Sequence, residues 1–157
     1  MKTRFRVAAI LIFAACRNSY LHNSVVAQTD VLSIGLALSN YRSANGAYPP
    51  ISSGTCKALD RFLVPNFIVS HVPAVDPWGN PYEFEISSNS YSVWSDGADG
   101  RRDARWQVSR TIDRSCDIVL ANGKYIQYPV GIASPGGEWE PDGAVIRERC
   151  IASSPLR

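Results

Sequence analysis

The sequence lacks the residues and motifs on which most enzymes depend. It has two histidines in 157 residues, His22 and His71, and neither lies beside a recognisable nucleophile. The serine-hydrolase motif Gly-x-Ser-x-Gly, the zinc motif His-Glu-x-x-His and a phosphate-binding loop are all absent. We therefore expect no catalytic residues, no small-molecule substrate and no enzymatic activity.

Long apolar runs and an excess of one charge are missing too. The apolar block Val7–Ala15 has nine residues, against the roughly 18 to 20 that a membrane-spanning helix needs. Charged residues make up 19% of the chain and apolar residues 45%, a balance that favours a folded domain over a disordered chain. Three basic residues and no acidic one precede residue 16, so the net charge of +2 becomes −1 without that segment. Net charge therefore gives no argument for a nucleic-acid partner.

The first fifteen residues have the pattern of a signal peptide. Basic residues precede the apolar block, which ends in Phe-Ala-Ala-Cys. This ending resembles the cleavage box of bacterial lipoproteins, and it predicts removal of residues 1–15 and lipidation of Cys16. The alternative is ordinary cleavage after Ala27, which would give a secreted or soluble periplasmic protein.

The four cysteines are Cys16, Cys56, Cys116 and Cys150. If Cys16 carries lipid, the other three lie in an oxidising compartment and allow one disulfide and one free thiol. Sequence alone does not choose the pair, and Cys116 with Cys150 is the candidate because Cys56 opens a predicted helix. The absence of Cys-x-x-Cys excludes a zinc ribbon or a thioredoxin-like site.

Apolar spacing predicts an amphipathic helix after a linker over residues 16–27. Thr29 and Asp30 can cap the helix, and Asn45-Gly46 supplies a left-handed stop. One face of the helix repeats at helical spacing. Its residues are Val31, Ile34, Leu38 and Tyr41, with Leu32 and Leu36 beside them. A second, shorter helix is expected over residues 56–63.

Alternating apolar residues predict a sheet after the helices. Strands are expected over residues 82–86 and 91–95, and Asn122-Gly123 between two apolar runs predicts an additional C-terminal hairpin. The fold class expected is therefore α+β, with the N-terminal helix packed on a small antiparallel sheet. One domain covers residues 28–130, and an irregular tail covers residues 131–157.

The segment from residue 96 to residue 117 is the candidate binding site. It holds five carboxylates, and calcium prefers carboxylate and carbonyl oxygens, although the spacing is not that of an EF-hand. Asp and Gly are also ordinary turn residues, and the adjacent arginines can pair with the carboxylates. The Arg-rich segment 101–114 can alternatively contact an acidic partner or lipid headgroups.

Three strings follow one another along the chain. Residues 45–49 read Asn-Gly-Ala-Tyr-Pro, residues 76–82 read Asp-Pro-Trp-Gly-Asn-Pro-Tyr, and residues 95–100 read Ser-Asp-Gly-Ala-Asp-Gly. In this order they resemble the globular domain of the major (G-type) pseudopilin of type II secretion systems, over about residues 28–118. The resemblance implies a helix packed on a small antiparallel sheet and a non-enzymatic role among secretion-system components.

The resemblance also implies a structural calcium ion after the third string. By position, Asp99 and Asp117 match carboxylate ligands, and Asp96 lies where the family offers a backbone carbonyl. Cys116 stands where the family commonly has Asp, and Asp113 is the candidate to replace it. The predicted metal site is therefore Asp96, Asp99, Asp113 and Asp117, with calcium as the cofactor.

Two parts of the chain depart from the family pattern. The family's basic leader, its Gly-Phe-Thr-Leu-x-Glu motif and its long apolar helix are not recognisable before Asp30, and residues 119–157 are additional. Because family members polymerise through that apolar helix, we expect this chain not to join a pseudopilus in the usual way.

We expect a lipid-anchored protein on the periplasmic face of a bacterial membrane, accessory to type II secretion or repurposed from it. The alternative is a periplasmic binding lipoprotein that contacts an acidic partner through the Arg-rich segment 101–114.

Overall fold

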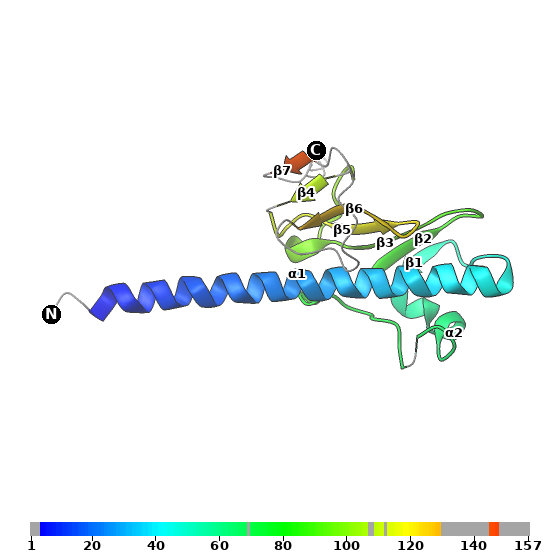
Figure 1. Ribbon diagram of the computed structural model, residues 1–157, viewed down its shortest axis with the longest axis horizontal. Helices are drawn as coiled ribbons and strands as arrows, with labels where there is room; N and C mark the ends of the chain where they lie inside the picture. The colour runs from blue at the N-terminus through cyan, green and yellow to red at the C-terminus, as the bar shows by residue number, and fades with distance from the viewer. Residues whose placement is uncertain (1–3, 69, 107–108, 112, 130–144, 148–157) are drawn as a thin grey trace.

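A computed structural model describes residues 4–68, 70–106, 109–111, 113–129 and 145–147. One long helix projects from a smaller head, in which a sheet lies along the C-terminal half of the helix (Figure 1). This helix, α1, spans Arg4–Asn45, and its 42 residues make a rod about 63 Å long at 1.5 Å per residue. We call residues 4–21 the stalk, and the rest of the described chain the head.

The helix α1 begins at Arg4 and not at Thr29, where a cap was expected. Thr29 lies inside the helix and donates its hydroxyl to the carbonyl of Val25 at 2.8 Å. Residues 16–27 are helical and form no irregular linker. The physical reason is that residues 4–45 contain no proline and a single glycine, so nothing interrupts the hydrogen-bond ladder. Cleavage before Cys16 stays a prediction.

Within the described residues, no helix is both long enough and apolar enough to cross a membrane.

Seven strands form one sheet, in the order β1-β2-β3-β5-β6-β4-β7. Their bounds are β1 Ser53–Thr55, β2 Glu83–Ile86, β3 Tyr91–Ser95, β4 Ser109–Thr111, β5 Ile118–Ala121, β6 Lys124–Pro129 and β7 Val145–Arg147. The first five strands in this order pair antiparallel, while β4 joins β6 and β7 in parallel. The predicted α+β fold, with a helix on an antiparallel sheet, is confirmed.

The sheet contains the expected C-terminal hairpin and one strand that was not expected. The hairpin of β5 and β6 has its expected turn, with Asn122 at φ 50° and Gly123 at φ 80°. It belongs to the same sheet as the earlier strands, because β5 pairs with β3. Strand β4 forms inside the Arg-rich segment, where no alternation indicated it. Of the predicted tail, β7 is a strand, and residues 131–144 and 148–157 lie outside the described residues.

The apolar face of α1 packs on this sheet as the spacing predicted. Val31, Ile34 and Leu38 are fully buried, and the predicted stop is confirmed because Gly46 has φ 77° and donates to the Arg42 carbonyl at 2.8 Å. Leu36 was expected to widen the stripe but is 52% exposed.

Gly35 sets how closely α1 approaches the sheet. A Cβ at this position would overlap Cδ2 of Leu120 on β5 and would lie 3.0 Å from the hydroxyl of Tyr91 on β3. Both of these side chains are buried, so neither can move aside without opening the core. The backbone contact at Gly35 therefore fixes the distance between helix and sheet.

Two tyrosines hold α1 in the first turns that pack against the head. The Tyr82 hydroxyl, just before β2, donates to the carboxylate of Asp30 at 2.9 Å. The Tyr125 hydroxyl on β6 donates to the carbonyl of Gln28 at 2.8 Å. Burial raises the pKa of both tyrosines and of Asp30. Asp30, expected as a helix cap, therefore joins α1 to the sheet.

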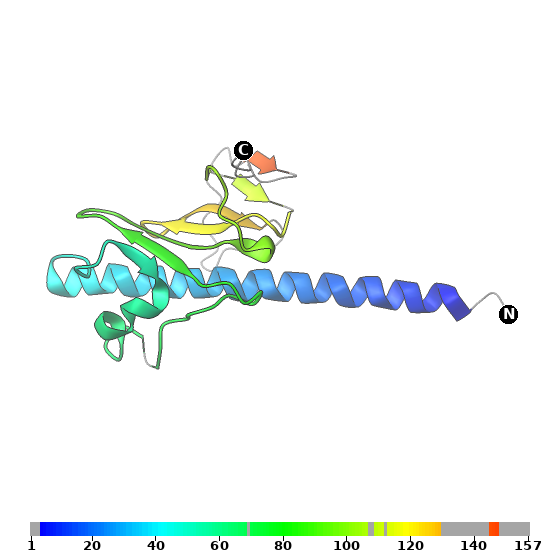
Figure 2. The ribbon, with the colours of Figure 1, turned by 180° about the vertical axis from the view of Figure 1, so that it is seen from behind.

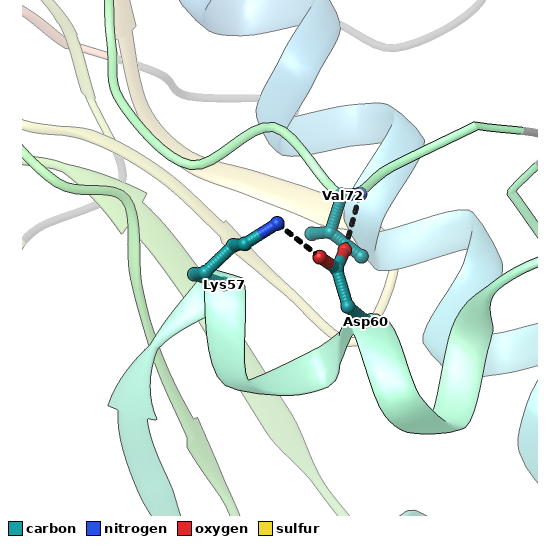
Figure 3. Close-up of polar contacts among 3 residues, drawn as sticks. All are labelled: Lys57, Asp60 and Val72. Atoms are coloured by element: carbon teal, nitrogen blue, oxygen red, sulfur yellow. Dashed lines mark hydrogen bonds and ion pairs between the residues drawn. The ribbon is translucent and has the colours of Figure 1, made fainter.

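The short helix expected over residues 56–63 is confirmed as η1 (Cys56–Leu59) followed by α2 (Asp60–Leu63). The chain then returns along α1 as an extended segment over residues 70–75. Figure 3 shows the carboxylate of Asp60 between the ammonium group of Lys57 and the N–H of Val72. The bond to Val72 is 2.7 Å long. It fixes the backbone of this segment at the point where the Val72 side chain enters the core and is fully buried.

The substitution Gly35→Ala should destabilise the protein, although alanine is the better helix former. Overpacking costs about 1–3 kcal/mol, against a gain in helix propensity of up to about 1 kcal/mol. Thermal unfolding followed by circular dichroism should show a lower Tm, and Ser33→Ala on the exposed face should change it little. A higher Tm for Gly35→Ala would show that the helix does not rest on Leu120.

The substitution Asp60→Asn should reduce stability at pH 7 by about 0.5–1 kcal/mol, the range for a partly exposed charged pair. The hydrogen bond from Lys57 and then that from Val72 lower the pKa of Asp60. Its contribution is therefore present above the unfolded-state pKa of about 3.9 and is lost as the pH falls through the lower folded-state value. Urea denaturation should show the gap to wild type closing as the pH falls below about 3.9, whereas a constant gap would contradict the assignment.

Candidate functional site

Residues 96–117, which we call the acidic loop, connect β3 to β5 over the face of the sheet opposite α1. Tyr91 and Val93 on β3 belong to the core under α1, so the alternating residue Trp94 faces the other way. The ring of Trp94 lies 5.0 Å from that of Trp106. The guanidinium group of Arg102 lies 4.1 Å from the first ring and 4.6 Å from the second. These stacked groups cover the outer face of the sheet.

The turn over residues 76–80 holds the start of the acidic loop. Asp76 is buried, and its Oδ1 accepts the N–H groups of Trp78 at 3.0 Å and of Asn80 at 2.9 Å. Its Oδ2 accepts the hydroxyl of Ser95 at 2.6 Å. The Asn80 amide donates to the Gly97 carbonyl at 2.8 Å. The second and third strings that carry the sequence resemblance are therefore in direct contact.

Asp103 and Asp117 bind each other's backbone. Oδ2 of Asp117 accepts the N–H of Asp103 at 3.0 Å and the indole N–H of Trp106 at 2.6 Å. Oδ2 of Asp103 accepts the N–H of Asp117 at 3.2 Å and the amide of Gln127 on β6 at 2.6 Å. The sequence analysis counted Asp103 among the carboxylates but did not choose it as a site residue. An aspartate between arginines is typical of a surface ion pair, so no local signal marked it.

Among the residues that the structure describes, two carboxylate oxygens at the base of the loop are buried and have no hydrogen-bond partner. They are Oδ1 of Asp117, whose residue is fully buried, and Oδ1 of Asp96. Burial, together with the negative charges of Asp103 and Asp96, raises the pKa of Asp117 to about 7, although the hydrogen bond from Trp106 lowers it. Burial, and then the charge of Glu83, also raises the pKa of Asp96. An ionised carboxylate is costly in such a place unless a cation accompanies it.

The other two predicted ligands use one oxygen each in local turns. Oδ1 of Asp99 accepts the N–H of Arg101 at 3.0 Å, and its side chain is exposed. Oδ1 of Asp113 accepts the N–H of Ser115 at 3.0 Å and its hydroxyl at 2.5 Å. The charges of Asp99 and Asp113 reach Asp103, whose pKa is raised mainly by burial. Asp99 and Asp113 therefore act on Asp103 through their charges, while their own oxygens serve local turns.

Backbone oxygens also converge at this place. Gly97 has φ 66°, and a Cβ on it would lie within 3.0 Å of the carbonyl oxygens of Arg114, Ser115 and Cys116. Carbonyl and carboxylate oxygens together are the ligands that calcium takes, so the chemistry of the loop fits a calcium ion. Within the described ranges, no group of three or more His, Cys, Asp or Glu side chains stands ready to hold a metal. Carbonyl oxygens would therefore have to complete the ligand set.

The cysteines of the head differ in their chemical state. Cys116 is disulfide-bonded, whereas Cys56 is a free thiol, fully buried under the sheet. The pairing of Cys116 with Cys150 stays a prediction, because Cys150 lies outside the described residues.

Both histidines are exposed, His22 on α1 and His71 on the segment after α2.

Comparison with known proteins identifies one family. The family described as type II secretion system (T2SS), protein G, matches residues 17–110, which is more than half of the chain. The match begins directly after Cys16 and ends in β4, so it includes the first part of the acidic loop. No curated protein matches the sequence. The chain belongs to the protein G family of type II secretion systems.

Proposed function

We propose that the protein serves type II secretion as a membrane-anchored, non-enzymatic pseudopilin-type head, accessory to the filament. Family membership supports the pseudopilin-type role. The observation that carries the finer proposal is the continuous helix α1, which packs on the sheet with one half and projects freely with the other (Figure 1). Such a rod can hold a binding head at a fixed distance from a membrane.

The length of the apolar block favours an anchor over a transmembrane helix. Nine apolar residues of the stalk, Val7–Ala15, cover about 14 Å along a helix, against a bilayer core of about 30 Å. The block can enter one leaflet but cannot span both. If residues 1–15 are removed, this block is removed with them, and acylation of Cys16 would then supply the anchor, because each buried CH₂ contributes about 0.8 kcal/mol.

We also propose that calcium binds the acidic loop. The unpaired Oδ1 atoms of Asp96 and Asp117 and the carbonyl oxygens beside Gly97 would hold the ion, with Asp99 and Asp113 nearest the loop surface. A divalent cation would neutralise the buried carboxylates and stabilise the ordered loop. The role of the ion is structural, since it would fix the surface that the head presents to its partners.

Calcium should raise the Tm of the full-length protein, and a chelator should lower it. Saturation at about 100 times Kd corresponds to about 2.7 kcal/mol, or roughly 5–10 °C for a chain of this size. The variant Asp117→Asn should show the same Tm with calcium and with chelator. The control variant Glu85→Gln, at an exposed position of β2, should keep the full difference. Equal Tm values for the wild type in both conditions would exclude the calcium site.

Deletion of the gene should reduce secretion through the type II pathway, and the full-length chain should restore it. The mature protein should begin at Cys16 and carry the mass of attached acyl chains, and Cys16→Ser should prevent both this mass and the restoration. A mature chain that begins at Gln28 would contradict the lipid anchor and would support cleavage after Ala27, which gives a soluble protein. Unchanged secretion in the deletion strain would refute the accessory role.

A further inference from the structure

We propose that Arg101, Arg102 and Arg105 form a surface that binds the anionic headgroups of the membrane that holds the stalk. The three side chains are exposed, and they lie in the acidic loop between η2 (Gly97–Asp99) and β4. This inference rests on the proposed membrane anchoring. It adds a second contact with the same membrane, through the head itself.

The position of the loop in the head gives the first argument. In both ribbon views, η2 and β4 lie at the end of the head from which the stalk projects (Figure 1, Figure 2). The turn between β2 and β3 lies at the opposite end. An anchored stalk therefore directs the loop toward the membrane and the β2–β3 turn away from it.

The buried and the exposed layers of this loop differ in their net charge. The carboxylates of Asp103 and Asp117 are 8% and 0% exposed, with hydrogen bonds that point into the fold. The arginines of the same loop are exposed to solvent. In the part of the chain that the structure describes, no ion pair joins Arg101 or Arg105 to a carboxylate. Asp99 is the exposed carboxylate beside them, so the outer layer of the loop carries more positive than negative charge.

The central arginine of this surface is held in place. Stacking on two indole rings orients the guanidinium group of Arg102, and such contacts contribute about 0.5–2 kcal/mol. Trp106, which forms one of the rings, is only partly buried. Tryptophan beside arginine is a common arrangement at membrane–water interfaces, where the ring meets the headgroup layer.

The length of the connection also suits a membrane contact. Cys16 and Ser24 are eight residues apart, which is about 12 Å along a helix, and Ser24 is already buried. This distance is close to the Debye length of about 8–10 Å in physiological salt. Basic residues at this end of the head therefore lie within reach of an anionic surface.

The same guanidinium groups could bind an acidic protein, but the structure favours the membrane. A stalk anchored in the bilayer keeps this end of the head beside the headgroups permanently, which gives the contact a high effective concentration. A separate acidic protein would have to enter the narrow space between the head and the membrane. The two hypotheses differ for lipid vesicles that contain no protein: a headgroup surface should bind them, whereas a surface for an acidic protein should not.

The test measures flotation of the full-length, non-acylated chain with lipid vesicles in low salt. Vesicles of phosphatidylcholine alone report on the apolar stalk, and vesicles with about one-third phosphatidylglycerol add the negative charge. Each arginine near such a surface contributes about 1 kcal/mol, or about fivefold in affinity. The double variant Arg101→Gln/Arg105→Gln should therefore bind the anionic vesicles about 25-fold more weakly and should bind the neutral vesicles as wild type does. Arg102 is left in place so that the tryptophan stack stays intact.

Matched controls separate this proposal from the anchoring proposal. Arg61→Gln, exposed on α2, should leave binding to anionic vesicles unchanged. Failure of the wild type to bind anionic vesicles more tightly than neutral ones would overturn the headgroup surface, while the anchoring proposal is tested separately by the acyl mass on Cys16. If the wild type and the double variant bind anionic vesicles equally, the headgroup surface alone is wrong. If the double variant loses only the binding of polyglutamate, the loop binds acidic protein and the membrane proposal fails.

Discussion

The burial of Asp117 is the constraint on which the acidic loop depends. A carboxylate that is fully buried beside Asp103 and Asp96 must find donors or a cation, since like charges and desolvation both oppose its ionised form. Its donors come from the indole of Trp106 and the backbone of Asp103. Asp103 also accepts a hydrogen bond from Gln127 on β6. The contacts of Asp117 and Asp103 therefore attach the acidic loop to strand β6. The other oxygen of Asp117 has no such donor among the described residues, which is the physical argument for a cation.

The strings that mark the family resemblance are explained by contacts between elements. Asp76 uses one oxygen to close its own turn and the other to bind Ser95, so a single buried carboxylate joins the turn to the end of β3. Tyr48, in the string that ends α1, places its ring 5.6 Å from that of Tyr91 on the same strand. Both strings therefore attach connecting segments to β3. Their chemistry is structural, which agrees with a family whose role is assembly.

Local patterns predicted those parts of the fold that local physics determines. The buried positions Val31, Ile34 and Leu38 followed from helical spacing, and the central hairpin followed from Asn122-Gly123, since two residues at positive φ select that turn. The start of α1 could not be placed in the same way. A signal peptide and the first turns of a long helix have the same basic and apolar composition, so residues 4–27 fitted either description.

Non-local contacts account for the rest of what the sequence did not show. Strands β4 and β7 have three residues each, and their parallel partners are distant in the chain, so neither leaves an alternating pattern. In the candidate site, Asp117 was chosen from the resemblance and is indeed buried, whereas Asp99 is exposed. Asp103 is the residue that binds Asp117, because the path of the acidic loop over the sheet brings residues fourteen positions apart together. Spacing in the sequence contains no information about that path.

Contacts between α1 and the sheet hold the stalk and the head together as one rigid unit. Tyr82 and Tyr125 bind the same turn of α1 from different parts of the chain, one before β2 and one on β6. Breaking either bond would leave a buried polar group unpaired, at a cost of about 1–3 kcal/mol. Further along the helix, Gly35 seats the backbone directly on Leu120 and Tyr91. A helix held by these contacts cannot pivot on the sheet, so the direction of the stalk is fixed relative to the head.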